Sequence, residues 1–188
     1  MKSRWFLALA VLLAALVPAA GAQTGPQMAR SVVSSDNYVS LQPVPRGRVF
    51  EVAVVANIQP AYHINAHKVL EEYLIPTEIE AKSPVGFHLL STEYPAGELR
   101  QFSFSKRKLA VYTGRVVLRL RFLAERNAPL GTRELPLTLR YQACNNTMCL
   151  PPVEVPVSVN VTIAKAGSPA RRVHPEIFKT GNRNSRRR

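Results

Sequence analysis

Alternation of apolar and polar residues is the dominant pattern of this chain. From residue 153 to 163, valine or isoleucine occupies every second position, and polar residues or proline stand between them. Residues 115–122 and 134–141 alternate in the same way. A period of two places all the apolar side chains of a strand on one face. Each of these segments is therefore predicted to be a β-strand with one face in a core and one face in water.

Further strands are predicted between turn residues. Residues 49–58 form a more evenly apolar run, and shorter candidates lie at 39–41, 77–81, 87–92 and 109–112, with prolines and glycines separating them. About eight strands at this spacing are typical of an all-β antiparallel sandwich. Only residues 67–74 have helical spacing of apolar positions, and because Pro76 follows within two turns, a short turn in a loop is expected there.

The N-terminal segment has the pattern of a signal peptide. Lys2 and Arg4 precede an apolar run over residues 5–17, and small residues follow at 19–22. A helix of thirteen residues at about 1.5 Å per residue is shorter than the roughly 30 Å of a bilayer core. Residues 1–22 are thus predicted to be a cleaved signal, and the mature chain is expected to be periplasmic or secreted.

Charge separates a body from a tail. The 188 residues carry a formal net charge of +13, of which +7 lies in residues 165–188 and only +4 in residues 23–164. Because the tail is strongly basic and poor in apolar residues, it is predicted to be disordered, with at most weak contact to an anionic membrane surface. Aromatic residues make up only 7% of the chain, which disfavours a nucleic-acid stacking surface. The domain is therefore expected at residues 23–164.

The only two cysteines are candidates for chemistry. Cys144 and Cys149 lie between two predicted strands, so both thiols are expected at one end of the sandwich. A bond between them would close a ring of six residues, which restricts the unfolded chain by only about 2 kcal/mol. Such a bond would stabilise the fold only weakly, whereas an accessible local bond is suited to thiol–disulfide exchange. The residues alone leave a structural and a redox role open.

A metal site is a further alternative. His63 and His67 have a spacing that suits the histidine half of a zinc site with the two cysteines, and Met148 adds a soft ligand that would suit monovalent copper. Loop histidines without any ligand role are the simpler interpretation. No metal is therefore expected.

A resemblance to a known family favours the redox role. The segment Tyr-Gln-Ala-Cys…Cys-Leu-Pro-Pro at 141–152, together with Tyr-His-Ile-Asn at 62–65 and residues 71–77, resembles the amino-terminal periplasmic domain of the thiol:disulfide interchange protein DsbD. The resemblance covers residues 31–164. It implies an immunoglobulin-like fold and a relay of electrons by thiol–disulfide exchange, without a metal or organic cofactor.

The same resemblance implies roles for individual residues. Cys149 would form mixed disulfides with partner proteins, and Cys144 would close the intramolecular bond. The region 98–108 would shield the sulfurs from stray oxidants with an aromatic side chain. The residues expected to line the pair are Tyr62, His63, Asn65 and either Phe102 or Phe104, and an imidazolium at His63 would favour a thiolate.

The resemblance also predicts partners. The long form of the family continues into a membrane domain and a thioredoxin-like domain, which this chain is expected to lack, and its cysteine spacing differs from that of some members. A separate membrane-embedded or thioredoxin-like reductase is therefore expected as the electron donor, and a periplasmic disulfide isomerase or oxidoreductase as the acceptor. The rival interpretation is a non-catalytic sandwich that binds an envelope protein and has a passive disulfide.

Overall fold

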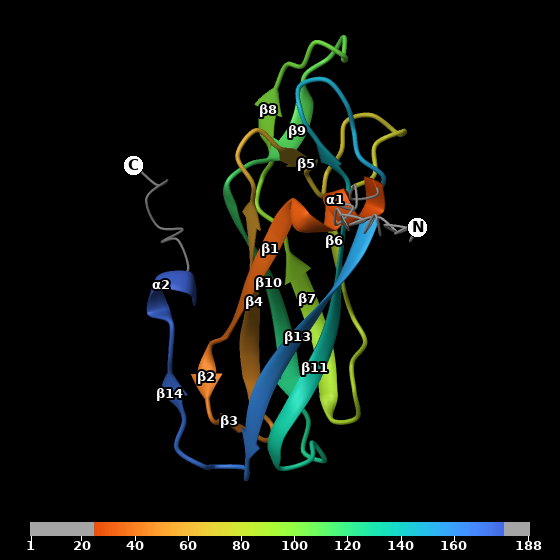
Figure 1. The fold of residues 1–188 in the computed structure, drawn as a ribbon. Coiled ribbons are helices and arrows are strands. Elements are labelled where there is room, and N and C mark those ends of the chain that lie inside the picture. The colour runs from red at the N-terminus through yellow and green to blue at the C-terminus, as the bar shows by residue number, and fades with distance from the viewer. Residues whose placement is uncertain (1–24, 179–188) are drawn as a thin grey trace, which may run out of the picture.

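A computed structural model describes residues 25–178, which form a β-rich fold with two short helices (Figure 1). The signal peptide expected at residues 1–22 and the last part of the basic tail lie outside this range. The elements are α1 (Gly25–Ser31), β1 (Val33–Val39), β2 (Leu41–Gln42), β3 (Val44–Pro45), β4 (Val49–Ile58), β5 (His63–Asn65), β6 (Glu78–Ala81), β7 (Phe87–Glu93), β8 (Glu98–Arg100), β9 (Leu109–Tyr112), β10 (Arg115–Ala124), β11 (Gly131–Tyr141), β12 (Ala143–Cys144), β13 (Val153–Ala164), β14 (Arg171–Arg172) and α2 (Pro175–Phe178).

Two four-stranded sheets form a sandwich. One has the order β1-β4-β10-β7 and the other the order β3-β13-β11-β6. All neighbouring strands in these sheets are antiparallel except β13 and β3. The longest ladder joins β11 and β13, from Gly131 opposite Ile163 to Tyr141 opposite Val153. The predicted all-β, immunoglobulin-like antiparallel sandwich is therefore confirmed.

The core lies between the two sheets and follows the alternation of the sequence. In β13, Val157, Val159, Val161 and Ile163 are buried, whereas the residues between them are exposed. The inner faces of β10 and β4 contribute Leu118, Leu120, Phe122 and Phe50, and the rings of the two phenylalanines stack with centroids 5.8 Å apart. Burial of this apolar surface is the main force that holds the sheets together.

Some elements had no clear signal in the sequence. Strand β1 is largely polar, yet its residues pair with β4 from Val33 opposite Ile58 to Val39 opposite Val52. It is an edge strand of its sheet, so half of its side chains face water and backbone hydrogen bonds hold it in place. Residues 67–74 contain turns and no helix, as predicted.

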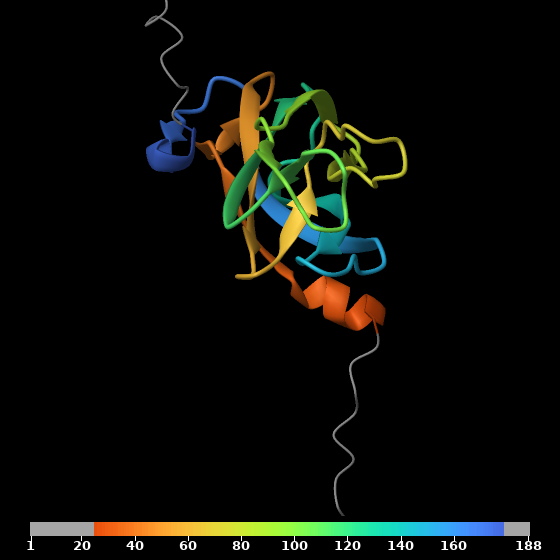
Figure 2. The ribbon, with the colours of Figure 1, turned by 90° about the horizontal axis from the view of Figure 1, so that it is seen from above.

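The region after the sandwich strands is more ordered than predicted. Residues 165–178 were expected to be disordered, but β14 pairs with β2, and α2 buries Ile177. The Arg119 guanidinium of β10 donates a hydrogen bond to the Ile177 carbonyl oxygen at 2.9 Å. This segment runs outside the sheet that contains β4, and in Figure 2 both helices lie at the periphery of the packed strands. The expectation of disorder is thus wrong for residues 165–178.

Strand β4 has buried apolar residues on both of its faces. Ala53 and Val55 point away from the main core, in register with Arg119 and Val117 of β10, and yet both are buried. A strand buried on both faces does not need to alternate. The uniform apolar run at 49–58 therefore reflects a strand that is covered from two sides.

A third four-stranded sheet lies at one end of the sandwich, at the top of Figure 1, with the order β12-β5-β9-β8. Its strands have only two to four residues. Among residues 25–178 there is no helix long and apolar enough to span a bilayer.

Ile177 provides a test of the C-terminal layer. Ile177→Ala removes buried apolar surface beneath α2, and we expect it to lower the free energy of unfolding by about 2 kcal/mol. Glu176→Ala, at an exposed position of the same helix, is the control and should change stability by less than about 0.5 kcal/mol. Urea unfolding of both variants measures this difference. Equal stability of the two variants would contradict a packed C-terminal layer.

Candidate functional site

The two cysteines lie in a tight turn that leaves the small sheet. Cys144 is the last residue of β12 and forms a disulfide with Cys149, with the Cα atoms 4.0 Å apart. The Asn145 side chain closes the turn, because its Oδ1 accepts hydrogen bonds from the Thr147 and Met148 amides, both at 2.9 Å. After the turn, the Leu150 amide donates to the Ala143 carbonyl oxygen at 2.8 Å. The loop is thus fixed at its base and at its tip.

The two halves of the disulfide differ strongly in exposure. Cys144 is 1% exposed, whereas Cys149 is exposed and follows Met148, which is 56% exposed. Thiol exchange requires in-line access of a thiolate to one of the two sulfurs. The arrangement presents the Cys149 side of the bond to an incoming group and keeps the Cys144 side in the protein.

Pairing of β12 with β5 places His63 beside Cys144. The two residues are directly opposite in register, and Ala143 is opposite Ile64. Side chains of directly opposite residues share one face of a sheet. Ile64 and Ala143 point into the main core, so Cys144 and His63 lie on the other face. The sequence prediction that His63 lies near the cysteine pair agrees with this geometry.

His63 is enclosed and uncharged. Its side chain is 3% exposed, and its ring stacks on Phe102 with centroids 4.1 Å apart and an interplanar angle of 19°. Burial, with a smaller effect of the positive Arg100, lowers the pKa of His63 from 6.5 to about 4. The imidazolium expected from the sequence is therefore not the form present near neutral pH.

The segment 98–108 covers this face of the small sheet. Phe102 stacks on His63 and, with centroids 5.3 Å apart, on Phe104. The Ser103 hydroxyl donates a hydrogen bond to the Asn146 carbonyl oxygen at 3.1 Å, which joins the segment to the cysteine turn. Phe102 is partly buried and Phe104 is 43% exposed. Of the two aromatic candidates, Phe102 is the one that stacks on the ring beside Cys144.

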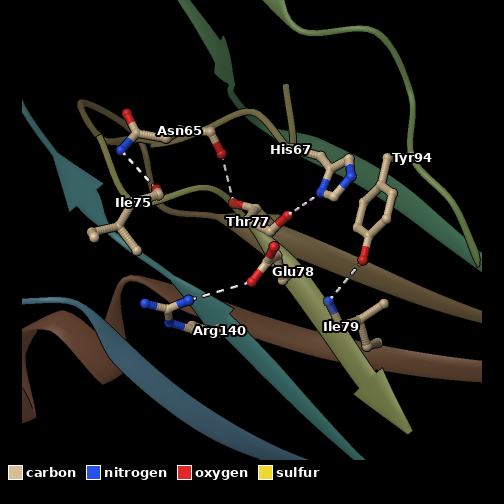
Figure 3. A network of polar contacts seen from close by, with 8 residues as sticks. All are labelled: Asn65, His67, Ile75, Thr77, Glu78, Ile79, Tyr94 and Arg140. Carbon is tan, nitrogen blue, oxygen red and sulfur yellow. Dashed lines mark hydrogen bonds and ion pairs between the residues drawn. The ribbon is translucent and has the colours of Figure 1, made fainter. Parts of the chain in front are cut away.

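Asn65 holds a second loop against the same sheet (Figure 3). Its side chain is fully buried, and its Nδ2 donates to the Ile75 carbonyl oxygen at 3.0 Å. The Thr77 hydroxyl donates to the Asn65 carbonyl oxygen at 2.6 Å. These bonds fix residues 66–77, so the structure gives Asn65 a clear role in positioning the loop next to the site.

His67 belongs to that loop and not to the cysteine pair. Its ring stacks on Tyr94 with centroids 3.7 Å apart, and its Nδ1 donates to the Thr77 carbonyl oxygen at 3.2 Å (Figure 3). In the described part of the chain, no three or more His, Cys, Asp or Glu side chains are grouped so that they could hold a metal ion. The two sulfurs are joined to each other, and His63 and His67 make separate aromatic stacks.

Gln142 belongs to the site although the sequence did not indicate a role for it, and Tyr62 lies elsewhere than expected. Gln142 accepts a hydrogen bond from Asn65 Nδ2 at 3.3 Å and donates to the Leu150 carbonyl oxygen, so it links β5 to both ends of the cysteine turn. Its place two residues before Cys144 was the only signal in the sequence. Tyr62, expected to line the pair, packs against the main core.

A small apolar cluster supports the site from the same face of the sheet. Leu109 and Val111 of β9 pack with Leu74, and Val69 and Phe102 lie against them. This cluster is separate from the core between the two large sheets. Because Phe102 contacts both the cluster and His63, the covering segment is held by apolar packing as well as by hydrogen bonds.

Comparison with known proteins agrees with this geometry. The family model described as "Thiol:disulfide interchange protein DsbD, N-terminal" matches residues 30–160. The chain belongs to this family. The family takes its description from a thiol:disulfide interchange protein, of which it is the N-terminal part. Among curated proteins, none matches the chain.

Solved structures match the chain only at low identity and low TM-score. The N-terminal periplasmic domain of ScsB from Proteus mirabilis is 11% identical, with a TM-score of 0.45, and the match covers 68% of this chain and 46% of that one. The periplasmic chaperone SfaE is 15% identical, with a TM-score of 0.25, and the match covers 70% of this chain and 58% of that one. The chain thus spans less than two thirds of either structure.

The low pKa of His63 predicts acid sensitivity. In the unfolded chain a histidine binds a proton below about pH 6.5, whereas in the folded domain His63 does so only below about pH 4. The unfolded state therefore binds more protons in this window, and stability falls as the pH drops through it, by up to about 3 kcal/mol. Urea unfolding of the oxidised protein between pH 7 and 4 should show this loss.

Two variants separate this effect from other titrations. In His63→Phe the decrease in stability between pH 7 and 4 should be smaller than in the wild type, because the titrating group is gone. His88→Phe, which replaces an exposed histidine of β7, should keep the wild-type pH profile. Identical profiles for all three proteins would show that His63 is not held uncharged.

Proposed function

We propose that this DsbD-family domain is an electron relay of the bacterial periplasm. A reductase that is membrane-embedded or thioredoxin-like reduces the Cys144–Cys149 bond, and the reduced domain then passes two electrons to an envelope disulfide isomerase or oxidoreductase. Residues 1–22 are proposed to direct the chain to this compartment as a cleaved signal. The sandwich at 23–164, extended by the ordered layer up to residue 178, is the working domain.

The observation that carries this proposal is the unequal exposure of the two sulfur-bearing residues. Cys149 is exposed at the end of the turn, and Cys144 is buried opposite His63. A passive clip has no need of an accessible half, whereas a relay needs one sulfur that partners reach and one that they do not. The asymmetry supports the assignment of Cys149 to mixed disulfides and of Cys144 to the intramolecular bond.

The exchange is balanced in atoms and electrons. A donor thiolate attacks Cys149 Sγ, the Cys144–Cys149 bond breaks, and its electron pair leaves on Cys144 Sγ. The second donor thiol then attacks the donor sulfur, which releases Cys149 and leaves the donor oxidised. In the other half of the cycle, the Cys149 thiolate attacks the acceptor disulfide and Cys144 resolves the mixed bond. Two electrons and two protons move in each half.

Exposed apolar side chains near the disulfide support a protein as partner. Met148 is in the cysteine turn, Phe104 is in the segment linked to that turn, and Tyr73 lines a shallow pocket together with Phe104. Tyr73 is 69% exposed. Apolar side chains gathered at one end of a soluble domain are typical of a binding surface. A partner that docks here would bring its own thiol to Cys149.

Trapping of mixed disulfides tests the proposal directly. Cys144→Ala should accumulate a disulfide between Cys149 and a thioredoxin-fold partner whose second active-site cysteine has been replaced by serine, because neither protein then has a thiol that resolves the mixed bond. Cys149→Ala, the matched control, should trap far less, because Cys144 is buried. Mass spectrometry of the species trapped with purified thioredoxin that lacks its second active-site cysteine identifies the bonded cysteine. Equal trapping by both variants would contradict the assignment.

The reduction potential separates a relay from a passive clip. Structural disulfides usually lie below about −300 mV, whereas relay disulfides lie nearer to those of their oxidoreductase partners. Titration of the wild-type domain with glutathione or thioredoxin should therefore give a potential above that limit. A potential below it, without trapping, would favour the envelope-binding module with a structural bond.

Phe102 should limit access to the disulfide. Its ring stacks on His63 beside Cys144, and its segment is bonded to the cysteine turn. Phe102→Ala removes this cover and should accelerate reduction by dithiothreitol severalfold, which quenched-flow thiol assays measure. Phe104→Ala is the control, because Phe104 is more exposed and does not stack on His63, and its effect should be smaller. A larger effect of Phe104→Ala would reverse the assignment of the shielding residue.

A further inference from the structure

Two buried side-chain nitrogen or oxygen atoms are without a hydrogen-bond partner within residues 25–178, and both lie on β5. They are His63 Nε2 and Asn65 Oδ1. Buried polar atoms are almost always paired in folded proteins, so each exception calls for an explanation. His63 and Asn65 are two positions apart on one strand, so they share the face that also holds Cys144. The unpaired atoms therefore occur next to the only bond in the described chain that redox chemistry would change.

The His63 ring cannot turn toward another hydrogen-bond partner. The stack on Phe102 fixes the plane of its ring, and its 3% exposure leaves almost no access to water. Asn65 differs, because its Nδ2 has two acceptors, the Ile75 carbonyl oxygen and Gln142 Oε1. The position of Asn65 is thus explained by the loop it holds, whereas no contact in the oxidised protein explains the position of His63 Nε2.

We propose that His63 Nε2 is the hydrogen-bond partner of the Cys144 sulfur when the disulfide is open. This proposal rests on the proposed function and deepens it, since it assigns a residue that sets the balance between the oxidised and reduced forms. In the disulfide, the Cys144 sulfur has no proton and is a weak acceptor, so the imidazole remains unpaired. In the reduced protein, Cys144 is a thiolate or a thiol, and either form completes the pair.

The imidazole acts on the buried half of the exchange. When a donor thiolate attacks Cys149 Sγ, the bond to Cys144 breaks and the electron pair moves to Cys144 Sγ. The Nε2–H of the neutral imidazole donates a hydrogen bond to this thiolate, and a proton from solvent then converts it to the thiol. In the return step, the Cys144 thiol gives its proton back to solvent, the resulting thiolate attacks Cys149 Sγ in the mixed disulfide, and the acceptor sulfur leaves with the electron pair and takes up a proton.

Neutral His63 is well suited to this role, as its low pKa indicates. An imidazole that became charged would hold the thiolate strongly and slow its attack on the mixed disulfide, because nucleophilicity falls as the thiol pKa falls. A neutral donor stabilises the leaving thiolate in a site from which water is largely excluded, and it still permits the reverse attack. His63 would thus favour the reduced form while keeping Cys144 reactive.

Equilibration of the wild type, His63→Phe and His63→Gln with glutathione tests this pairing. His63→Phe keeps a ring for the stack on Phe102 but has no nitrogen, so the equilibrium should shift toward the disulfide by about fivefold, or about 20 mV at 29.6 mV per tenfold. His63→Gln keeps an N–H donor and should recover part of the shift. His88→Phe, an exposed control, should match the wild type. An unchanged equilibrium in His63→Phe, or an equal shift in His88→Phe, would overturn the proposal.

A second measurement needs no variant. The 15N resonance of His63 Nε2 in the wild-type protein should move to that of a hydrogen-bonded nitrogen on reduction, and the resonances of His88 should not move. An unchanged His63 resonance would overturn the proposal even if His63→Phe failed to fold. Failure of the relay function is recognised separately, because it is read from the Cys144→Ala variant, which would then form no mixed disulfide at Cys149.

Discussion

The antiparallel pairing of β12 with β5 is the contact on which the site depends. Only two residue pairs form it, yet they place Cys144 opposite His63 and Ala143 opposite Ile64. Ile64 and Ala143 are anchored in the main core, so the other face of this small sheet is left for the sulfur and the imidazole. The sandwich thus supplies a rigid base, and the chemistry lies on the face that the base does not use.

Two loops complete this face in different ways. Residues 66–77 are held by the buried amide of Asn65 and by the stack of His67 on Tyr94. The segment 98–108 is held by the pairing of β8 with β9, by the packing of Phe102 and by the hydrogen bond from Ser103 to the cysteine turn. An ion pair between Arg107 and Glu71 joins this segment to the loop at 66–77, so the two covers are tied to the same small sheet and to each other.

The segment after β13 packs on the outside of the sandwich. It adds β14, which pairs with β2, and α2, which buries Ile177 and lies near β4. A basic composition with few apolar residues predicted disorder for this segment. The segment is nevertheless ordered by two contacts. Ile177 is buried, and the Arg119 guanidinium donates a hydrogen bond to the Ile177 carbonyl oxygen.

Local alternation in the sequence determined the strands of the sandwich, because a period of two is a property of each strand by itself. The motif around Cys144 and Cys149 likewise indicated the family. Tertiary structure alone decided which cysteine is exposed, that His63 is uncharged, and that Phe102 rather than Phe104 stacks on it. These properties depend on burial and on contacts between residues distant in the chain, such as Ser103 with Asn146, and no local pattern encodes the distance between such residues.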